Sequence, residues 1–163
     1  MATKTQYDCF KTVYDEETTR YAQLENRSKL YLTIITFYLG AIAFKVDAVL
    51  KFVSQFKVPI SIYAAMAVVL LGALLLTVLA TRIRAYEGIY DPEDVIESFG
   101  QSAPLDDEFL DDRIIDLAVA AQRNAEQNNT VARVLQWASY LLAGAVLLQL
   151  VALLFAVINS RTT

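Results

Sequence analysis

The sequence contains no histidine and only one cysteine, Cys9. These absences exclude disulfide frameworks, zinc sites of the usual Cys/His kind, and catalysis by Ser-His-Asp or Cys-His groups. Cys9 is most simply a small residue on a helix. No Gly-rich phosphate loop is present among the five glycines. We therefore expect no enzyme activity, no cofactor and no metal site.

Basic charge is also scarce. The chain has 14 Lys and Arg against 18 Asp and Glu, a formal charge of −4 and a pI near 4.8, which argues against a nucleic-acid partner. Hydrophobic residues make up 56% of the 163 residues, and the mean hydropathy is +0.39. Since 20% of the residues are charged, we expect a small membrane protein with a substantial part in water.

The stretch from Val134 to Ile158 carries no charged residue. As a helix it covers roughly 37 Å, enough to cross a hydrocarbon core of about 30 Å. Its small and polar residues form a third-span series spaced by four and three: Ala138, Leu142, Ala145, Gln149, Ala152, Ala156 and Asn159. An amide at the bilayer centre needs a partner, so Gln149 is expected to bond another helix, its counterpart in an oligomer, or pore water.

Two further uncharged stretches, Leu30–Phe44 and Ile60–Thr81, predict a hairpin of two spans. The first covers only about 22 Å of helix. Its pattern stays amphipathic after Lys45, so we expect the helix to continue there, with the turn at Lys51–Pro59. No ionisable residue lies inside the three spans, which argues against a pump or secondary transporter.

One face of the first span carries small and hydroxyl side chains, which we call the Thr/Gly face. Its members are Thr33, Thr36, Gly40, Ala43 and Asp47, at steps of three and four. Such residues let membrane helices approach closely, so helix packing is one interpretation. The alternative is a polar path that ends at Asp47.

The segment before the hairpin carries an apolar stripe, the N-terminal stripe. It consists of Tyr7, Phe10, Tyr14, Tyr21 and Leu24, and Glu17 interrupts it where an apolar residue is expected. The stripe can pack on a helix of the same chain, form an oligomer or partner-binding face, or stack nucleotides, which nothing else in the sequence supports.

The soluble segment between the second and third spans contains a heptad series that continues into the membrane without Gly or Pro. Its members are Leu110, Ile114, Leu117, Ala121, Asn124, Asn128, Val131 and Leu135. We expect one helix from Asp106 to Ile158, after a short helix that starts at Asp91. Asn124 and Asn128 either set the register of an oligomer or cap the membrane domain. The acidic residues after Asp106 favour a helix N-terminus and need no metal.

The fold predicted is therefore all-α, with three membrane spans and cytoplasmic helical extensions. Its parts are an amphipathic helix (1–29), the hairpin (30–81), a helical insert (82–133) and the third span with a short tail (134–163). Lys and Arg are more frequent in the first and third of these parts, so the positive-inside rule places both in the cytoplasm and the C-terminus outside.

The segments Y-D-E-E-T-T-R-Y-A-Q-L-E-N-R-S-K-L-Y-L and R-N-A-E-Q-N-N-T-V-A-R flank a two-span hairpin and an insert. This layout resembles the transmembrane effectors of nucleotide-activated antiphage systems of the Pycsar and CBASS kinds. The resemblance implies a homo-oligomer of the bacterial inner membrane that perturbs or permeabilises the lipid bilayer. The alternative is a non-conducting anchor whose acidic cytoplasmic part recruits a cytosolic protein.

Overall fold

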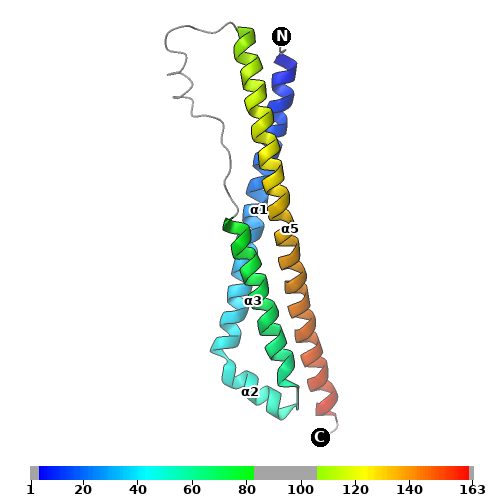
Figure 1. Ribbon diagram of the computed structural model, residues 1–163. Helices are drawn as coiled ribbons and strands as arrows, with labels where there is room; N and C mark the ends of the chain where they lie inside the picture. Colours follow the sequence, from blue (N-terminus) through cyan, green and yellow to red (C-terminus); the bar gives the residue numbers. More distant parts are fainter. Residues whose placement is uncertain (1–3, 83–105, 162–163) are drawn as a thin grey trace. The chain divides into compact units, whose positions relative to one another are not determined.

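The computed structural model describes the backbone of residues 4–82 and 106–161, and the side chains of these residues except 106–110. Within these ranges the chain forms α1 (Lys4–Phe44), α2 (Val46–Gln55), α3 (Ile60–Arg82) and α5 (Asp106–Ser160), and no strand (Figure 1). The all-α class is confirmed. The short helix predicted to start at Asp91 lies outside the described residues.

The chain divides into two compact units. Unit 1 comprises Met1–Glu25 and Ile83–Val131, and unit 2 comprises Asn26–Arg82 and Ala132–Thr163. The helices α1 and α5 contribute residues to both units.

In unit 1, the first part of α1 lies beside the first part of α5, and the two run in the same direction (Figure 1). The order of their contacts agrees, because Glu17 meets Asn128 and Arg20 meets Asn129. Two helices that share a 3.5-residue repeat pack side chains into the holes between those of the neighbour.

In unit 2, α3 packs against α1 and α5. A cluster of Met66 and Leu70 from α3 and Ala145 from α5 is buried, with Tyr38 and Ile42 of α1 packed against it. Small residues set the helix spacing: a Cβ added at Gly72 would lie 3.3 Å from the Leu141 side chain. Close approach of this kind is what small residues provide in membrane helices.

The structure buries one continuous stripe along α5. Leu117, Ala121, Asn124, Asn128, Val131, Leu135, Ala138, Ala145, Ala152 and Ala156 are buried. All of them belong to the heptad series or the third-span series, whereas Ala120, which is also buried, belongs to neither. The single long helix predicted from Asp106 to Ile158 is confirmed, and it extends to Ser160. An uninterrupted run of helix-compatible residues allowed this length to be read from the sequence.

The prediction that the first-span helix continues past Lys45 is wrong. The chain bends by 70° between α1 and α2, and Lys45 adopts φ −114° and ψ 25°, outside the helical region. The predicted turn at Lys51–Pro59 is also too long, because α2 extends through Gln55. Phe52 and Phe56 explain the bend, since they pack against the buried cluster of Val58, Ala152 and Ala156.

Two helices are long and apolar enough to cross a membrane, namely α3 and the stretch Asp111–Ser160 of α5. The number rises to three if the bent pair α1 and α2 is counted as one span. The membrane-protein class is therefore compatible with the structure.

Candidate functional site

A polar cluster lies inside the helix pair of unit 1, centred on Glu17 and Asn128. The Asn128 amide Nδ2 donates to the Glu17 carboxylate Oε2 at 2.8 Å and to the Glu17 backbone carbonyl at 3.0 Å. Asn128 is 2% exposed. The acid that interrupts the N-terminal stripe therefore meets an amide that interrupts the heptad series. Hydrogen bonds to a charged group are stronger than those between neutral groups.

Arg20 and Asn129 extend this cluster toward solvent. The Arg20 Nη2 donates to the Asn129 Oδ1 at 2.7 Å, and Nη1 lies 3.5 Å from the Glu17 carboxylate. Asn124, one heptad step before Asn128, is buried as well. No buried side-chain nitrogen or oxygen lacks a hydrogen-bond partner within the described ranges. A polar layer satisfied in this way holds the two helices in one register.

The N-terminal stripe lies on the side of α1 that packs within the helix pair of unit 1. Leu24 is buried, Tyr7, Tyr14 and Tyr21 are half-buried, and Phe10 lies at the margin with 36% exposed. The same spacing of three and four continues beyond the stripe through the inner positions of unit 2: Ser28, Tyr31, Ile35, Tyr38 and Ile42. Packing within the chain thus covers most of the stripe, and its use as a partner face remains a prediction.

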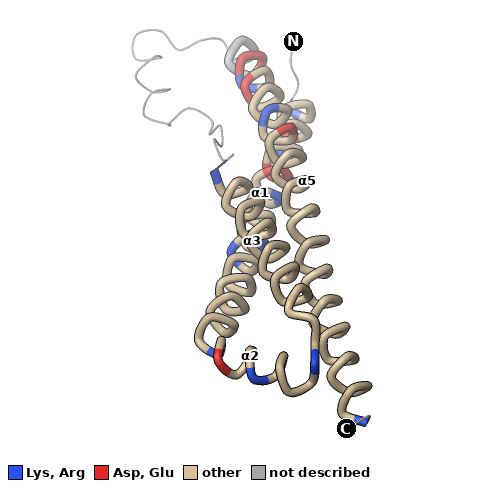
Figure 2. Tube along the Cα trace, turned by 60° about the horizontal axis from the view of Figure 1, so that its bottom comes forward, with Lys and Arg blue, Asp and Glu red and all other residues tan. Residues whose placement is uncertain are grey.

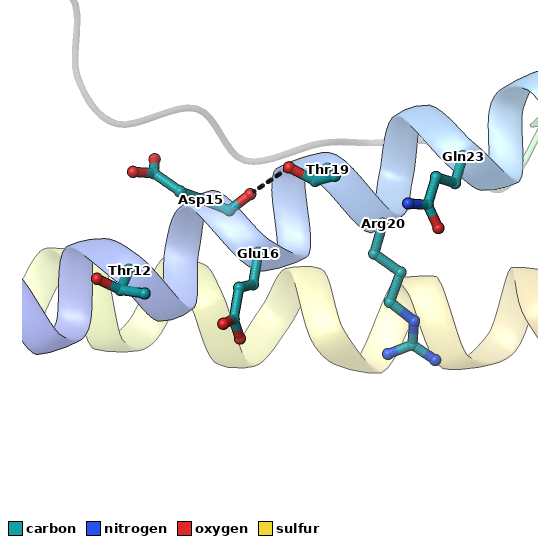
Figure 3. Close-up of a pocket in the computed structure, with 6 residues that line it drawn as sticks. All are labelled: Thr12, Asp15, Glu16, Thr19, Arg20 and Gln23. Atoms are coloured by element: carbon teal, nitrogen blue, oxygen red, sulfur yellow. Dashed lines mark hydrogen bonds between the residues drawn. The ribbon is translucent and has the colours of Figure 1, made fainter.

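A shallow polar groove runs along the outer side of α1 in unit 1. Among the described residues it is lined by Thr12, Asp15, Glu16, Thr19, Arg20 and Gln23 (Figure 3). The Thr19 hydroxyl donates to the Asp15 backbone carbonyl at 2.9 Å. Both acids of the groove are exposed, so this surface is negatively charged apart from Arg20.

The Thr/Gly face of α1 points away from the other helices of unit 2. Thr33, Thr36 and Gly40 are exposed. The Thr33 hydroxyl donates to the Lys29 carbonyl at 2.9 Å, and the Thr36 hydroxyl donates to the Leu32 carbonyl at 2.6 Å. These hydroxyls are satisfied by their own helix, so the face can stay in an apolar surrounding. Asp47 lies beyond the bend, in the first turn of α2, and is exposed.

Gly40 differs from the other two glycines of the described helices. A Cβ at Gly72 would meet Leu141 at 3.3 Å and one at Gly144 would meet Val69 at 3.9 Å, but one at Gly40 would meet nothing within 4 Å. Glycine inside a helix costs about 1 kcal/mol relative to alanine. At Gly72 the close approach of Leu141 offsets this cost, at Gly144 an added Cβ would make an ordinary contact with Val69, and at Gly40 it would meet no described residue.

Gln149 is half-buried on the inner side of α5, between the buried Ala145 and Ala152. These two alanines contact α3 residues or the turn before α3. Within one copy of the chain, the inner face of α5 therefore packs against neighbouring helices. Of the two faces considered for an opening, only the Thr/Gly face is exposed.

Two features mark the limits of the apolar part of α5. Trp137 and Tyr140 are exposed, and their rings meet edge to face with centroids 5.8 Å apart. Trp and Tyr are enriched at membrane–water interfaces. At the other end, the Asn159 amide donates to the Phe56 carbonyl at 2.8 Å. The helix from Tyr140 to Asn159 covers about 29 Å, close to the thickness of a hydrocarbon core.

Charged side chains lie outside this apolar part. Figure 2 shows α3 without charge except at its C-terminal end, and charges along α2 and at the C-terminal end of α5. In the sequence these charges are Lys45, Asp47, Lys51 and Lys57 in or beside α2, and Arg161 after α5. Within the described ranges, no group of three or more Asp, Glu, Cys or His side chains is placed to hold a metal ion.

Comparison of the chain with protein-family models, with curated proteins and with solved structures gave no match.

Sequence reasoning identified Glu17 and Asn128 separately but did not pair them. The signal was present, because an acid at an apolar stripe position and an amide in a heptad series each need a polar partner. The contacts of Arg20 with Asn129 and of Asn159 with Phe56 had no comparable signal, since one involves an exposed side chain and the other a backbone carbonyl.

Proposed function

We propose that the chain is an oligomeric effector of the bacterial inner membrane that crosses the bilayer three times and permeabilises it in antiphage defence. In this proposal α1 supplies the third span, α2 bends away at its end, and copies associate through the Thr/Gly face. The observation that carries the proposal is the environment of Gly40, where an added Cβ would meet none of the described residues within 4 Å.

The physical argument starts from the energetics of membrane helices. The hydrophobic effect does not drive helices together in lipid, so close packing of small residues has to supply the association energy. Thr33, Thr36 and Gly40 offer such a surface on α1, and it is exposed in the single chain. A second copy that packs there would offset the cost of Gly40 and bring hydroxyl-bearing helices together.

Leakage from dye-loaded liposomes tests this function. We expect the wild-type protein to release the dye and Gly40→Leu to reduce the rate about tenfold, the factor that about 1.4 kcal/mol of association energy gives. Because an added Cβ at Gly40 would meet none of the described residues within 4 Å, the variant should retain its fold. Circular dichroism checks this. Gln149→Leu tests the inner face of α5 in the same assay.

Ala143→Leu is the matched control, because it adds a leucine at an exposed α5 position away from the Thr/Gly face. Liposomes with this variant should release dye at the wild-type rate, and the variant should show the same oligomer mass in detergent. Equal leakage and equal mass for Gly40→Leu would rule out the Thr/Gly face as the assembly surface.

A non-conducting anchor is the second candidate function. The exposed acidic groove at Asp15 and Glu16 favours it, since this surface suits a basic segment of a cytosolic protein. Two results together would decide for the anchor. Liposomes that contain the oligomeric protein would retain their dye, and the protein would bind a cytosolic partner that Asp15→Asn/Glu16→Gln no longer binds.

A further inference from the structure

The turn after α2 ends the helix in a backbone arrangement that usually calls for glycine. The Val58 amide bonds the Val53 carbonyl at 3.1 Å, and the Phe56 amide bonds the Phe52 carbonyl at 3.0 Å. The first of these is the bond that defines a Schellman motif, and it leaves Lys57 at the left-handed position with φ 51°. Among the described residues Lys57 is the only non-glycine with positive φ.

A lysine there carries a conformational cost that glycine or asparagine would largely avoid. The ammonium group does not stabilise the Schellman motif, so an interaction outside the motif has to offset the conformational cost of lysine at this position. The charge is the property that distinguishes Lys57 from the residues that fit the backbone best.

The surroundings of Lys57 indicate what the charge meets. Lys45 precedes α2, Lys51 lies within it, Arg161 follows α5, and Asp47 is the single acid of this end. The bond between Asn159 and Phe56 ties the end of α2 to the end of α5. That end lies about 29 Å along the helix from Tyr140, which is the depth of the opposite headgroup layer.

Some apolar side chains of α2 pack on the rest of the protein, and others are exposed. Phe52 and Phe56 pack on the cluster around Val58, whereas Val46 and Leu50 are 49% and 48% exposed and Phe44, at the bend, is 86% exposed. A helix bent by 70° from a membrane-crossing helix lies nearly in the plane of the bilayer surface. Amphipathic helices in this position bury their apolar side at the acyl boundary and present basic residues to anionic headgroups.

We propose that α2 and the turn after it bind the headgroups of anionic phospholipids. Lys45, Lys51 and Lys57 supply the ammonium groups that contact the phosphates. Phe44, Val46 and Leu50 enter the acyl layer beside them. This inference requires that the chain sits in a membrane but does not require that it opens one, so it stands or falls separately from the leakage assay.

A tryptophan at the site reports which lipid surrounds it. Trp137 is the only tryptophan, so Leu50→Trp in a Trp137→Phe background gives one local fluorophore. The full chain is reconstituted in equal phosphatidylcholine and phosphatidylglycerol, with bromine on the acyl chains of one lipid at a time. We expect stronger quenching by the brominated phosphatidylglycerol.

Lys57→Gly removes the charge while supplying the residue that the backbone prefers. We expect it to lower the preference for phosphatidylglycerol by up to about fivefold, the factor that about 1 kcal/mol per basic side chain gives. Lys45→Gln/Lys51→Gln/Lys57→Gly should abolish the preference. The same substitutions should leave quenching of the native Trp137 unchanged in a protein that keeps Leu50.

Each other outcome overturns the proposal. Equal quenching by both lipids in the parent reporter, or a preference that survives the triple substitution, shows that these lysines do not select the headgroup. Absence of quenching by either lipid places α2 outside the bilayer. Loss of the preference in potassium phosphate, but not in potassium chloride of equal ionic strength, assigns the site to free phosphate.

Discussion

At the scale of single residues, Glu17 and Asn128 carry the most specific interaction of unit 1. Each is polar at a position where its helix otherwise places apolar or small residues, and the two meet at 2.8 Å. Removing one partner leaves a partly buried group without its bond, whereas replacing both with apolar residues removes the requirement altogether. The pair is therefore expected to specify the helix register more than to stabilise the fold.

A double-mutant cycle tests this expectation. We predict that Asn128→Leu alone lowers the free energy of unfolding by about 1–3 kcal/mol, because the Glu17 Oε2 loses the Asn128 donor and only the contact of Oε1 with Arg20 remains. Glu17→Leu/Asn128→Leu should return close to the wild-type value, since it completes two apolar repeats. Denaturant unfolding in mild detergent, followed by circular dichroism, gives the four free energies.

Asn129→Leu is the control for this cycle. It breaks the exposed contact with Arg20, and such surface interactions are worth about 1 kcal/mol or less. Additive effects of the Glu17 and Asn128 substitutions would contradict the proposed coupling.

Lys57 allows a second residue-scale prediction. Its left-handed backbone favours glycine and disfavours β-branched side chains. We expect Lys57→Gly to unfold at the wild-type temperature or above it, and Lys57→Val to unfold lower by an amount that corresponds to about 1–2 kcal/mol. A thermal melt of the three proteins measures the order, and a lower midpoint for the glycine variant would argue against a Schellman motif in solution.

At the scale of helices, α5 is organised by small residues at a seven-residue spacing. Ala138, Ala145 and Ala152 are all buried to 2% exposure or less. Side chains of this size let α3 and α1 approach α5 closely, and the dispersion contacts that result hold the helices of unit 2 together. The bend at Lys45 belongs to the same scale, because α2 is placed by the packing of Phe52 and Phe56.

Overpacking of the α5 interface should therefore be costly. We predict that Ala145→Leu, beside Met66 and Leu70, destabilises the protein by about 1–3 kcal/mol. Val146 is at the next position and is 53% exposed, so we expect the similar apolar change Val146→Leu to leave the stability unchanged. Unfolding in detergent measures both variants, and equal stability of the two would contradict the packing of α5 against α3.

At the scale of the whole molecule, the number of spans decides which surfaces share a compartment. Three spans place the residues before α1 and those after α5 on opposite sides of the membrane, whereas two spans place them on the same side. The helices α3 and α5 qualify by length and hydropathy, and α1 qualifies only together with α2. The charges before the apolar part of α1 explain this, since Arg27 and Lys29 precede it and α1 ends at Phe44, which leaves a short uncharged stretch.

The native cysteine provides a direct test of the topology. Cys9 is exposed and forms no disulfide, so a membrane-impermeant maleimide reports on its side of the membrane. We predict that Cys9 reacts only after spheroplasts are permeabilised. In a Cys9→Ser background, Ser160→Cys should react in intact spheroplasts. Protection of both positions until permeabilisation would indicate two spans, and a cytoplasmic marker enzyme controls for leakage.

The sequence by itself determined the all-α class, the length of α5 and the residues on its buried stripe. These features depend on local composition and on a 3.5-residue period, which a single chain displays without reference to its neighbours. It also supplied both halves of the Glu17–Asn128 pair, because each polar residue breaks an apolar pattern.

Only the tertiary structure decided which of these patterns face each other. It paired Glu17 with Asn128, turned α2 away from α1 at Lys45, and left the Cβ position of Gly40 without a contact among the described residues. Contacts of this kind join residues more than a hundred positions apart or depend on where two phenylalanines find a buried cluster. The same amphipathic period is compatible with a straight helix and with a bent one, so packing and the cost of burying charge made the choice.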